Sequence, residues 1–426
     1  MSACGLDFGT SNSGISLPAR DAVSLVALED SATSMPTAVF FAAEDPAATL
    51  YGRAAVREYL DGTPGRLMRS LKSLLGSSLM DETTAVGDRN IRYTDIVTLY
   101  LRTLRMRAGA ASGTALDAVV LGRPVRFDDD DAGRDAQAED TLRECARAAG
   151  FAHVEFQLEP IAAAMDYERA IDREQLVLVV DVGGGTADFA LVRLAPHART
   201  RVDRSDDVLA HDGVHIAGTD FDTRLNLAWV MPTLGFGGVG PQGKPVPGLV
   251  YHDLSTWHRI NFLYTPRFSG SLRELAAFFA EPTPYRRLRR VIERRLGHEI
   301  LGRTEQAKIE LSDAPATRID LAHVEAGLAV PARQAELLRL LEQLLSRLVA
   351  VGLGTLQHAG LDAARVDTVY FTGGSSGMSA LRAAFQRAFP ASRLAVGDLF
   401  GSVVSGLGLD AGRRFGPGAA RARTRA

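Results

Sequence analysis

The chain has 426 residues, of which 46% are hydrophobic, and its 48 lysines and arginines nearly balance 51 aspartates and glutamates. The net charge of −3 gives no reason to expect nucleic acid or a membrane surface as a partner. Two cysteines, Cys4 and Cys145, exclude a disulfide framework and are not spaced as a metal-binding pair. We therefore expect a cytoplasmic protein, long enough to form two lobes.

Strands and amphipathic helices alternate along the sequence. Apolar runs bounded by glycine, proline or acidic residues predict strands, whereas apolar residues repeated at spacings of three and four predict helices. The helices are expected at 96–106, 161–171, 337–348 and 381–389, and the strands at 116–121, 176–181, 189–194 and 366–372. This order predicts α/β layers. The sequence has neither a signal peptide nor eighteen successive apolar residues, so we expect no export and no membrane span.

Two similar glycine turns each follow an apolar strand that ends in an aspartate. Residues 5–10 are Gly-Leu-Asp-Phe-Gly-Thr, and residues 180–186 are Val-Asp-Val-Gly-Gly-Gly-Thr. Duplication of one α/β unit explains this similarity. Two copies that face each other would place both turns at one shared cleft, where loops commonly hold ligands.

The residue types in these turns suit phosphate binding. Glycine permits a positive φ and lets bare backbone N–H groups approach phosphate oxygens. Thr10, Ser11 and Thr186 add hydroxyl groups, while Asp7 and Asp181 are placed to hold Mg²⁺ through water. A single turn of this kind is more often an ordinary hairpin turn. A third glycine segment between a strand and a helix, at 371–377, favours nucleotide binding.

At these residues the chain resembles the nucleotide-binding domain of the seventy-kilodalton heat-shock chaperones, the DnaK-like family. Residues 5–13, 181–188 and 372–375 are similar to its two phosphate loops and its adenosine loop. Residues 159–165 and 305–312 are similar to its connecting helix and its adenosine-contacting helix. The resemblance implies a duplicated ribonuclease-H-like, actin-like ATPase fold, with two lobes around a central nucleotide cleft.

The resemblance also implies a domain organisation. Lobe one is expected at 1–175, with a C-terminal helix at 401–412 packing back on it, and lobe two at 176–400 with an enlarged insertion at 223–304. The basic segment 413–426 is expected to be a disordered tail. No peptide-binding domain is expected, and in this respect the chain is similar to the short YegD-like subgroup.

Four residues receive catalytic roles from the resemblance. Lys72 matches a lysine beside the terminal phosphate that helps to orient the attacking water. Glu159 and Asp181 match carboxylates that organise the water shell of the metal and the nucleophile, and Thr186 matches a hydroxyl near the terminal phosphate. Plainer alternatives are a solvated surface lysine for Lys72 and a helix cap before proline for Glu159.

The resemblance extends to a set of nucleotide contacts. These are Gly9, Thr10, Ser11, Asn12, Gly183, Gly184, Gly185, Thr186, Gly218, Glu305, Lys308, Ser312, Gly373, Gly374 and Ser375. Glu305, Lys308 and Ser312 share one helix face by their spacing, although an exposed ion pair is an alternative reason for it. Gly377 and Met378 stand where the family has an arginine that stacks on adenine. With no cation to cover the base, we expect weak base selectivity.

These inferences predict a chaperone-like, monomeric protein that binds ATP or ADP with Mg²⁺, hydrolyses ATP slowly and works with an unknown protein partner or co-chaperone. A nucleotide-sensing scaffold with little turnover and a small-molecule kinase on the same fold remain alternatives. Retention of Lys72 and both turn aspartates argues against a domain without turnover. No residue set identifies an acceptor pocket for a kinase.

Overall fold

The computed structural model describes residues 2–19, 22–44, 48–86, 89–199, 201, 204–241 and 243–416. The chain divides into two compact units. The first is formed by Met1–Ala217, Arg347–Gly377 and Leu381–Ala426, and the second by Gly218–Ser346 and Met378–Ala380. The predicted boundary between the lobes at residue 175 differs from the boundary between the units, which lies at Gly218. Both glycine turns therefore lie in the first unit.

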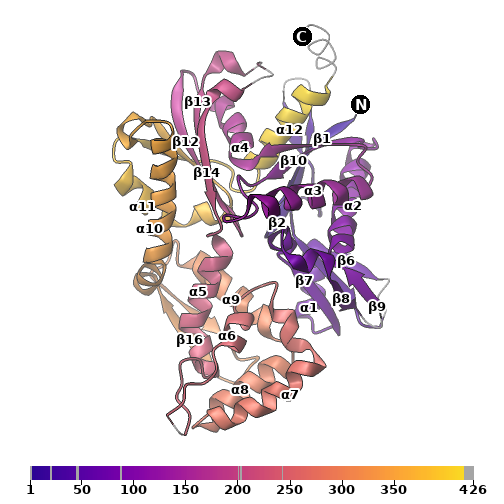
Figure 1. Cartoon of the computed structure of the whole chain (residues 1–426), viewed down its shortest axis with the longest axis vertical. Coiled ribbons are helices and arrows are strands. Elements are labelled where there is room, and N and C mark those ends of the chain that lie inside the picture. The colour runs from indigo at the N-terminus through magenta and orange to yellow at the C-terminus, as the bar shows by residue number, and fades with distance from the viewer. Residues whose placement is uncertain are drawn as a thin grey trace. The chain divides into compact units, whose positions relative to one another are not determined.

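The first unit contains two mixed sheets (Figure 1). In one of them, β1 (Ala3–Phe8) pairs in parallel with β10 (Ala118–Arg123) and antiparallel with β2 (Asn12–Pro18). Strand β11 (His153–Leu158) continues the parallel side, and β3 (Val23–Leu25) continues the antiparallel side. Asp7 is therefore the penultimate residue of a central, buried strand.

The other sheet repeats the order and directions of these five strands, and β4 (Ser34–Pro36) on β2 is an addition to the first sheet. Strand β12 (Gln175–Val182) pairs in parallel with β17 (Thr368–Thr372) and antiparallel with β13 (Ala187–Leu194). Strands β18 (Arg393–Val396) and β14 (Val208–Val214) continue its two sides. The shared pattern is what duplication of one α/β unit predicts.

Two helices, α4 (Glu159–Tyr167) and α12 (Ser402–Phe415), join the cores of both sheets. One buried cluster contains Val120 of the first sheet, Val179 of the second, Ala163 of α4 and Leu407 of α12. Glycines allow backbones to touch here, since a side chain on Gly5 of β1 would collide with the backbone of Gly408 in α12. The apolar run in α4 is buried on all sides, which explains its almost unbroken alanines.

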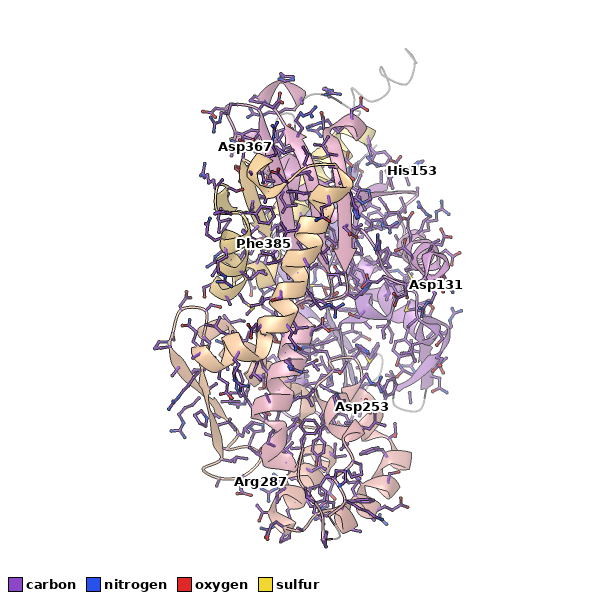
Figure 2. All side chains as sticks on the ribbon, turned by 60° about the vertical axis from the view of Figure 1, so that its left-hand side comes forward. Asp131, His153, Asp253, Arg287, Asp367 and Phe385 are labelled. Atoms are coloured by element: carbon purple, nitrogen blue, oxygen red, sulfur yellow. The ribbon has the colours of Figure 1, made fainter. Side chains whose placement is uncertain are left out.

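The remaining elements of the first unit include α1 (Gly52–Leu60), α2 (Tyr93–Ser112), α3 (Ala132–Ala148), β4 (Ser34–Pro36), β5 (Ala38–Ala42), β6 (Thr49–Tyr51), β7 (Gly65–Arg69), β8 (Thr83–Val86) and β9 (Arg89–Arg92). Strand β4 pairs with β2 of the first sheet, while β6, β5 and β7 form a three-stranded sheet and β8 and β9 form a two-stranded sheet. Asp131, labelled in Figure 2, caps α3 by accepting hydrogen bonds from the backbone N–H groups of Gly133 and Arg134.

The second unit is mainly helical. Its elements are α5 (Gly218–Trp229), α6 (Leu249–Leu254), α7 (Pro266–Leu275), α8 (Pro282–Glu293), α9 (Gly297–Glu310), β15 (Ala316–Asp320) and β16 (Ala329–Arg333). Helices α10 (Gln334–His358) and α11 (Ser379–Ala388) contribute residues to both units. Trp257, Ile260 and Leu301 form a small buried cluster within the predicted insertion.

The predicted strands and helices all occur, with shifted ends. The structure corrects the predicted tail, because Arg413 and Arg414 belong to α12, which ends at Phe415 instead of residue 412. Residues 417–426 lie outside the described part of the chain. Within that part, no helix is both long and apolar enough to cross a membrane. Cys4 is buried on the first strand as expected, and burial raises the pKa of its thiol to about 12.

Candidate functional site

The two glycine turns of the first unit lie against each other. A side chain on Gly184 would collide with the hydroxyl of Ser11, and a Cβ on Gly185 would come within 2.6 Å of Thr10 Oγ1. Among the residues described, none of the glycines in these two turns has a positive φ. The turns therefore require glycine for space, and the expectation of a left-handed backbone at these positions is wrong.

Hydrogen bonds hold each turn in place. Thr37 Oγ1 donates to the carbonyl oxygen of Gly9 at 2.8 Å, and the Thr37 N–H donates to Ser11 O at 2.9 Å. In the second turn, the Gly183 N–H donates to Thr186 O at 3.0 Å. Asn12 begins β2 directly after the first turn. The first turn is thus held by Thr37, which lies between β4 and β5, and the second by a hydrogen bond within the turn.

Lys72 and Glu159 form a buried ion pair, with Nζ 2.5 Å from Oε1. Lys72 lies in the 3-10 turn Leu71–Leu74, which follows Ser70 in a left-handed conformation with φ of 58°. The lysine and glutamate side chains are 5% and 9% exposed. The alternative of a solvated surface lysine is therefore wrong. Glu159 is the first helical residue and Leu158 the N-cap, so the capping alternative is also wrong.

Three further carboxylates are buried close enough to influence this pair. Burial, with Glu159 nearby, raises the pKa of Asp7 to about 7 and the pKa of Asp188 to about 7. Burial, followed by the charges of Glu159 and Asp188, raises the pKa of Asp181 well above its usual value. Burial alone would lower the pKa of Lys72, but the neighbouring carboxylates outweigh it and raise that pKa. The cluster holds more acidic groups than its one ammonium can balance.

Asp188 is a site residue that the sequence reasoning did not assign. It pairs directly with Asp181 across β13 and β12, and the Thr186 hydroxyl donates a hydrogen bond to it. The backbone N–H of Val125 also donates to Asp188 Oδ1 at 2.5 Å. Two like charges directly opposite each other on neighbouring strands destabilise the fold. Unfavourable arrangements of this kind persist mainly at functional sites.

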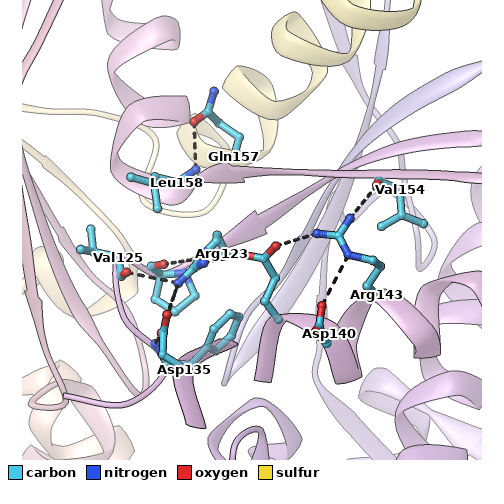
Figure 3. Close-up of polar contacts among 11 residues, drawn as sticks. Arg123, Val125, Asp135, Asp140, Arg143, Val154, Gln157 and Leu158 are labelled. Atoms are coloured by element: carbon cyan, nitrogen blue, oxygen red, sulfur yellow. Dashed lines mark hydrogen bonds and ion pairs between the residues drawn. The ribbon is translucent and has the colours of Figure 1, made fainter. Parts of the chain in front are cut away.

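The loop that presents Val125 is anchored by arginines (Figure 3). Arg123, the last residue of β10, lies 2.5 Å from Glu139 and 3.0 Å from Asp135 of α3. Arg143, one turn further along the same helix, also forms an ion pair with Glu139, at 2.6 Å. This network fixes the backbone donor to Asp188 without adding charge to the carboxylate cluster.

The donor set fits a hydrated divalent cation. Carboxylate oxygens are the ligands that Mg²⁺ prefers, and Mg²⁺ usually keeps several of its waters. In the described part of the chain, no three histidine, cysteine, aspartate or glutamate side chains converge closely enough to bind a metal directly. Binding of Mg²⁺ by Asp7 and Asp181 through water stays a prediction.

The third glycine segment joins the second phosphate turn. Gly373 has φ of 80°, and a Cβ there would meet the carboxylate of Asp181. Ser375 Oγ donates to Gly183 O at 2.8 Å, so the segment and the turn form one structure. Arg382 Nη1, from α11, donates to Gly377 O at 2.6 Å. This guanidinium is engaged with backbone carbonyls of the segment, and the expectation that no cation covers the base stays a prediction, as does weak base selectivity.

The other assigned nucleotide contacts lie in the second unit. Lys308 is buried, and its Nζ lies 2.6 Å from Asp222 Oδ1 and 3.3 Å from Gly218 O. Burial raises the pKa of Asp222 to about 6, although Lys308 opposes this shift. Glu305 precedes Lys308 on α9, and Ser312 follows the helix. Their role as nucleoside contacts stays a prediction.

The family of the chain follows from comparison with known proteins. The model of the family described as Hsp70 protein matches residues 3–230 and 287–394, which is more than half of the chain. The chain belongs to the Hsp70 family. Hsp70 membership implies the actin-like ATPase fold, in agreement with the mixed sheets of the first unit. The stretch between the two matched segments, 231–286, lies inside the predicted insertion.

Curated Hsp70 relatives share modest identity with the chain. "Chaperone protein HscA homolog" of Vibrio cholerae is 31% identical over 242 residues, which cover 52% of this chain and 36% of the relative. "Chaperone protein HscA" of Proteus mirabilis is 28% identical over 255 residues, covering 55% and 38%. "Chaperone protein DnaK" of Halobacterium salinarum is 29% identical over 188 residues, covering 44% and 28%. Each match spans little more than a third of the relative at most.

The first unit of this Hsp70 protein also contains a separate hollow of about 800 Å³. Its lining includes apolar Ile161 and Met165 of α4 and the charged side chain of Arg414. Arg414 lies 2.8 Å from Glu155 and 2.7 Å from Asp410. A residue assigned to a disordered tail is therefore part of a folded surface.

Proposed function

We propose that this chain is a magnesium-dependent ATPase that binds ATP between the two glycine turns of its first unit and hydrolyses it slowly. One observation carries the proposal. The buried Lys72–Glu159 pair lies with Asp7, Asp181 and Asp188 beside two glycine turns. A surplus of buried carboxylates calls for another cation, and bare backbone N–H groups suit phosphate oxygens.

The residues have separable tasks in this proposal. Backbone N–H groups of the two turns hold the phosphates, and the hydroxyls of Thr10 and Thr186 add hydrogen bonds. Asp7 and Asp181 hold hydrated Mg²⁺, which neutralises phosphate charge when bound. Lys72 stays charged because its carboxylate neighbours raise its pKa, so it supplies a fixed positive charge beside the terminal phosphate. Glu159 positions Lys72 and accepts hydrogen bonds from the attacking water.

The test is release of inorganic phosphate from ATP by the purified chain, with Mg²⁺ or with excess EDTA. Slow, Mg²⁺-dependent release that disappears in Lys72→Ala is the expected result. Tight binding of ATP without any release would favour the nucleotide-sensing scaffold. Phosphate transfer that depends on an added small-molecule acceptor would favour a kinase.

The alternative functions receive less support from the site. A scaffold without turnover has no need for a buried lysine held among four carboxylates, because such a cluster destabilises the folded chain. The protein partner and the monomeric state stay predictions. Adding cell extract to the assay tests for the partner, since a co-chaperone would raise the rate of phosphate release. Light scattering tests for the monomer.

A further inference from the structure

The second unit contains a hollow of about 320 Å³ that the proposed ATPase does not use. It lies on the 3-10 turn Ile260–Tyr264, on α7 and on α8, with Arg295 at the start of the loop before α9. Most of this segment falls outside the part of the chain that the family model matches. The lining includes the side chains of Tyr264, Arg273, Tyr285, Arg289 and Arg295.

Arg295 occupies a backbone position that normally requires glycine. Helix α8 ends in a motif where Arg295 N–H donates to Ile292 O at 3.2 Å and Leu296 N–H donates to Val291 O at 2.9 Å. The residue after the helix is left-handed in this motif, and Arg295 has φ of 56°. An L-amino acid is strained there, and such strain concentrates at functional sites.

The strained backbone directs a guanidinium group to the hollow. The Arg295 Cζ lies 5.9 Å from the centre of the Tyr264 ring. The Tyr264 hydroxyl accepts a hydrogen bond from Gly297 N–H at 2.9 Å, so the ring is itself fixed. Tyr285 forms another part of the lining, and its hydroxyl donates to Leu272 O at 3.2 Å. Two tyrosines with fixed hydroxyl groups thus form part of the lining, and one of them lies beside the cationic group.

Positive charge exceeds negative charge around the hollow. In the part of the chain that the structure describes, the Arg273 side chain forms no hydrogen bond or ion pair. Arg289 forms an ion pair with the exposed Glu293 at 3.2 Å. Glu293 is the one carboxylate among the lining residues. Other arginines of α8 are engaged away from the hollow, as Arg287, labelled in Figure 2, lies 2.6 Å from Glu325.

We propose that this hollow binds a phosphate group between Arg273, Arg289 and Arg295. Guanidinium groups form paired, charge-assisted hydrogen bonds with phosphate oxygens, which is why arginine predominates in such sites. The hollow is at the small end of ligand sites, so it fits one phosphate with a few attached atoms. The phosphate belongs either to a small phosphorylated molecule or to a phosphorylated side chain of a partner protein.

The left-handed backbone at Arg295 allows a substitution that removes the cation without destabilising the end of the helix. Arg295→Gly removes the cation and places at φ of 56° the residue that fits it best, so the helix end should be as stable or more stable. Arg294→Ala is the matched control, because Arg294 has the same charge, is the preceding residue and does not line the hollow. Arg273→Ala removes a second lining cation from a different helix.

The experiment is titration calorimetry of the full chain with saturating Mg²⁺ and a non-hydrolysable ATP analogue, which would fill the proposed ATPase site including its terminal-phosphate position. The probes are inorganic phosphate, O-phosphoserine and a phosphoserine peptide with its unphosphorylated twin. We expect phosphate probes to bind about tenfold more weakly to Arg295→Gly and Arg273→Ala, and within about twofold of wild type to Arg294→Ala. All variants should keep the ATPase rate of the wild type.

The outcomes decide the proposal independently of the ATPase. Tighter binding of the phosphopeptide than of free phosphate assigns the site to a phosphorylated protein, and equal binding assigns it to a small phosphorylated molecule. Absence of binding at millimolar phosphate overturns the proposal. Equal weakening by Arg294→Ala also overturns it, because the effect would then be general attraction by the basic helix.

Discussion

Two buried lysine–carboxylate pairs, one in each unit, have almost the same geometry but different surroundings. Lys72 lies 2.5 Å from Glu159 in the first unit, and Lys308 lies 2.6 Å from Asp222 in the second. All four side chains are at most 9% exposed. Around Lys72 there are three more buried carboxylates, whereas the Lys308 pair is completed by Gly218 O and the Trp257 ring N–H.

From this difference we expect the Lys308 pair to act mainly on stability and the Lys72 cluster mainly on the proposed turnover. The Lys308–Asp222 pair balances one ammonium with one carboxylate and ties α9 to α5. The cluster around Lys72 keeps a surplus of acidic groups in a buried place, which is unfavourable without a further cation. Similar contacts therefore predict different responses to substitution.

The largest expected effect is on stability in the second unit. Lys308→Ala leaves the Asp222 carboxyl buried without its partner and should lower the free energy of unfolding by about 3–5 kcal/mol at pH 7. Urea unfolding measures this change. Lys308→Met with Asp222→Leu, which removes both charges, should recover most of the loss. Failure of the double variant to recover stability would contradict a purely structural pair.

The matching substitution in the first unit should act mainly on turnover. Lys72→Ala should lower kcat for ATP hydrolysis by about 10²–10³-fold, the loss typical when one fixed group that stabilises developing charge is removed. Steady-state phosphate release measures it. Lys308→Ala should change kcat of the folded fraction by less than about threefold. Equal losses in both variants would erase the distinction between the two pairs.

The pH dependence of stability should identify Asp222. Its pKa is raised from the usual 3.8 to about 6 by burial, so the folded chain keeps this proton where the unfolded chain releases it. The favourable contribution is present below pH 4 and is lost as pH rises to about 6, roughly 3 kcal/mol in all. Unfolding at several pH values should show a fall that is smaller by about 3 kcal/mol in Asp222→Asn than in the wild type. A residual fall is expected because the pKa values of Asp7 and Asp188 are raised too. Identical pH profiles would refute the assignment.

The smallest expected effect is on metal-dependent binding. Asp181→Asn keeps the size of the side chain but removes a charge that would hold hydrated Mg²⁺, so Mg²⁺-dependent affinity for ATP should fall about 10–100-fold. Titration with and without Mg²⁺ measures the change, and Asp7→Asn should behave alike. Asp212→Asn, on the same sheet, is a control that should leave affinity unchanged. Unchanged affinity in both strand-end variants would remove the metal from the proposal.

The sequence is sufficient to predict the residues of the site that occur in both glycine turns. Asp7 and Asp181 were predicted because both precede a glycine turn, and both are penultimate residues of paired strands. Lys72 was accessible only through the resemblance, since its burial depends on a turn distant from Glu159 in sequence. Asp188 was missed although a signal existed: it is as far after the second turn as Asp181 is before it, so a hairpin must pair them.

Other features depend on packing that the sequence does not show. The Pro- and Gly-rich passage after Met231 disguised a mainly helical insertion, and no local pattern marks the unit boundary at Gly218. Arg382 contacts the third glycine segment from α11. This contact depends on the helix starting at Ser379, which the sequence does not show. Arg414 was assigned to a tail because its glycine-rich neighbours hide the end of α12.

The contact between β1 and α12 has a consequence for the order in which the protein matures on the ribosome. Ser16 Oγ in β2 donates to Val404 O at 2.5 Å across 388 positions, and Gly5 rests on Gly408. The central strand of the first sheet is therefore covered only after nearly the whole chain has emerged. Most of the second unit is one continuous segment, Gly218–Ser346, and can fold earlier. During synthesis the strand that carries Asp7 therefore stays uncovered by α12 until late, which favours aggregation at that stage.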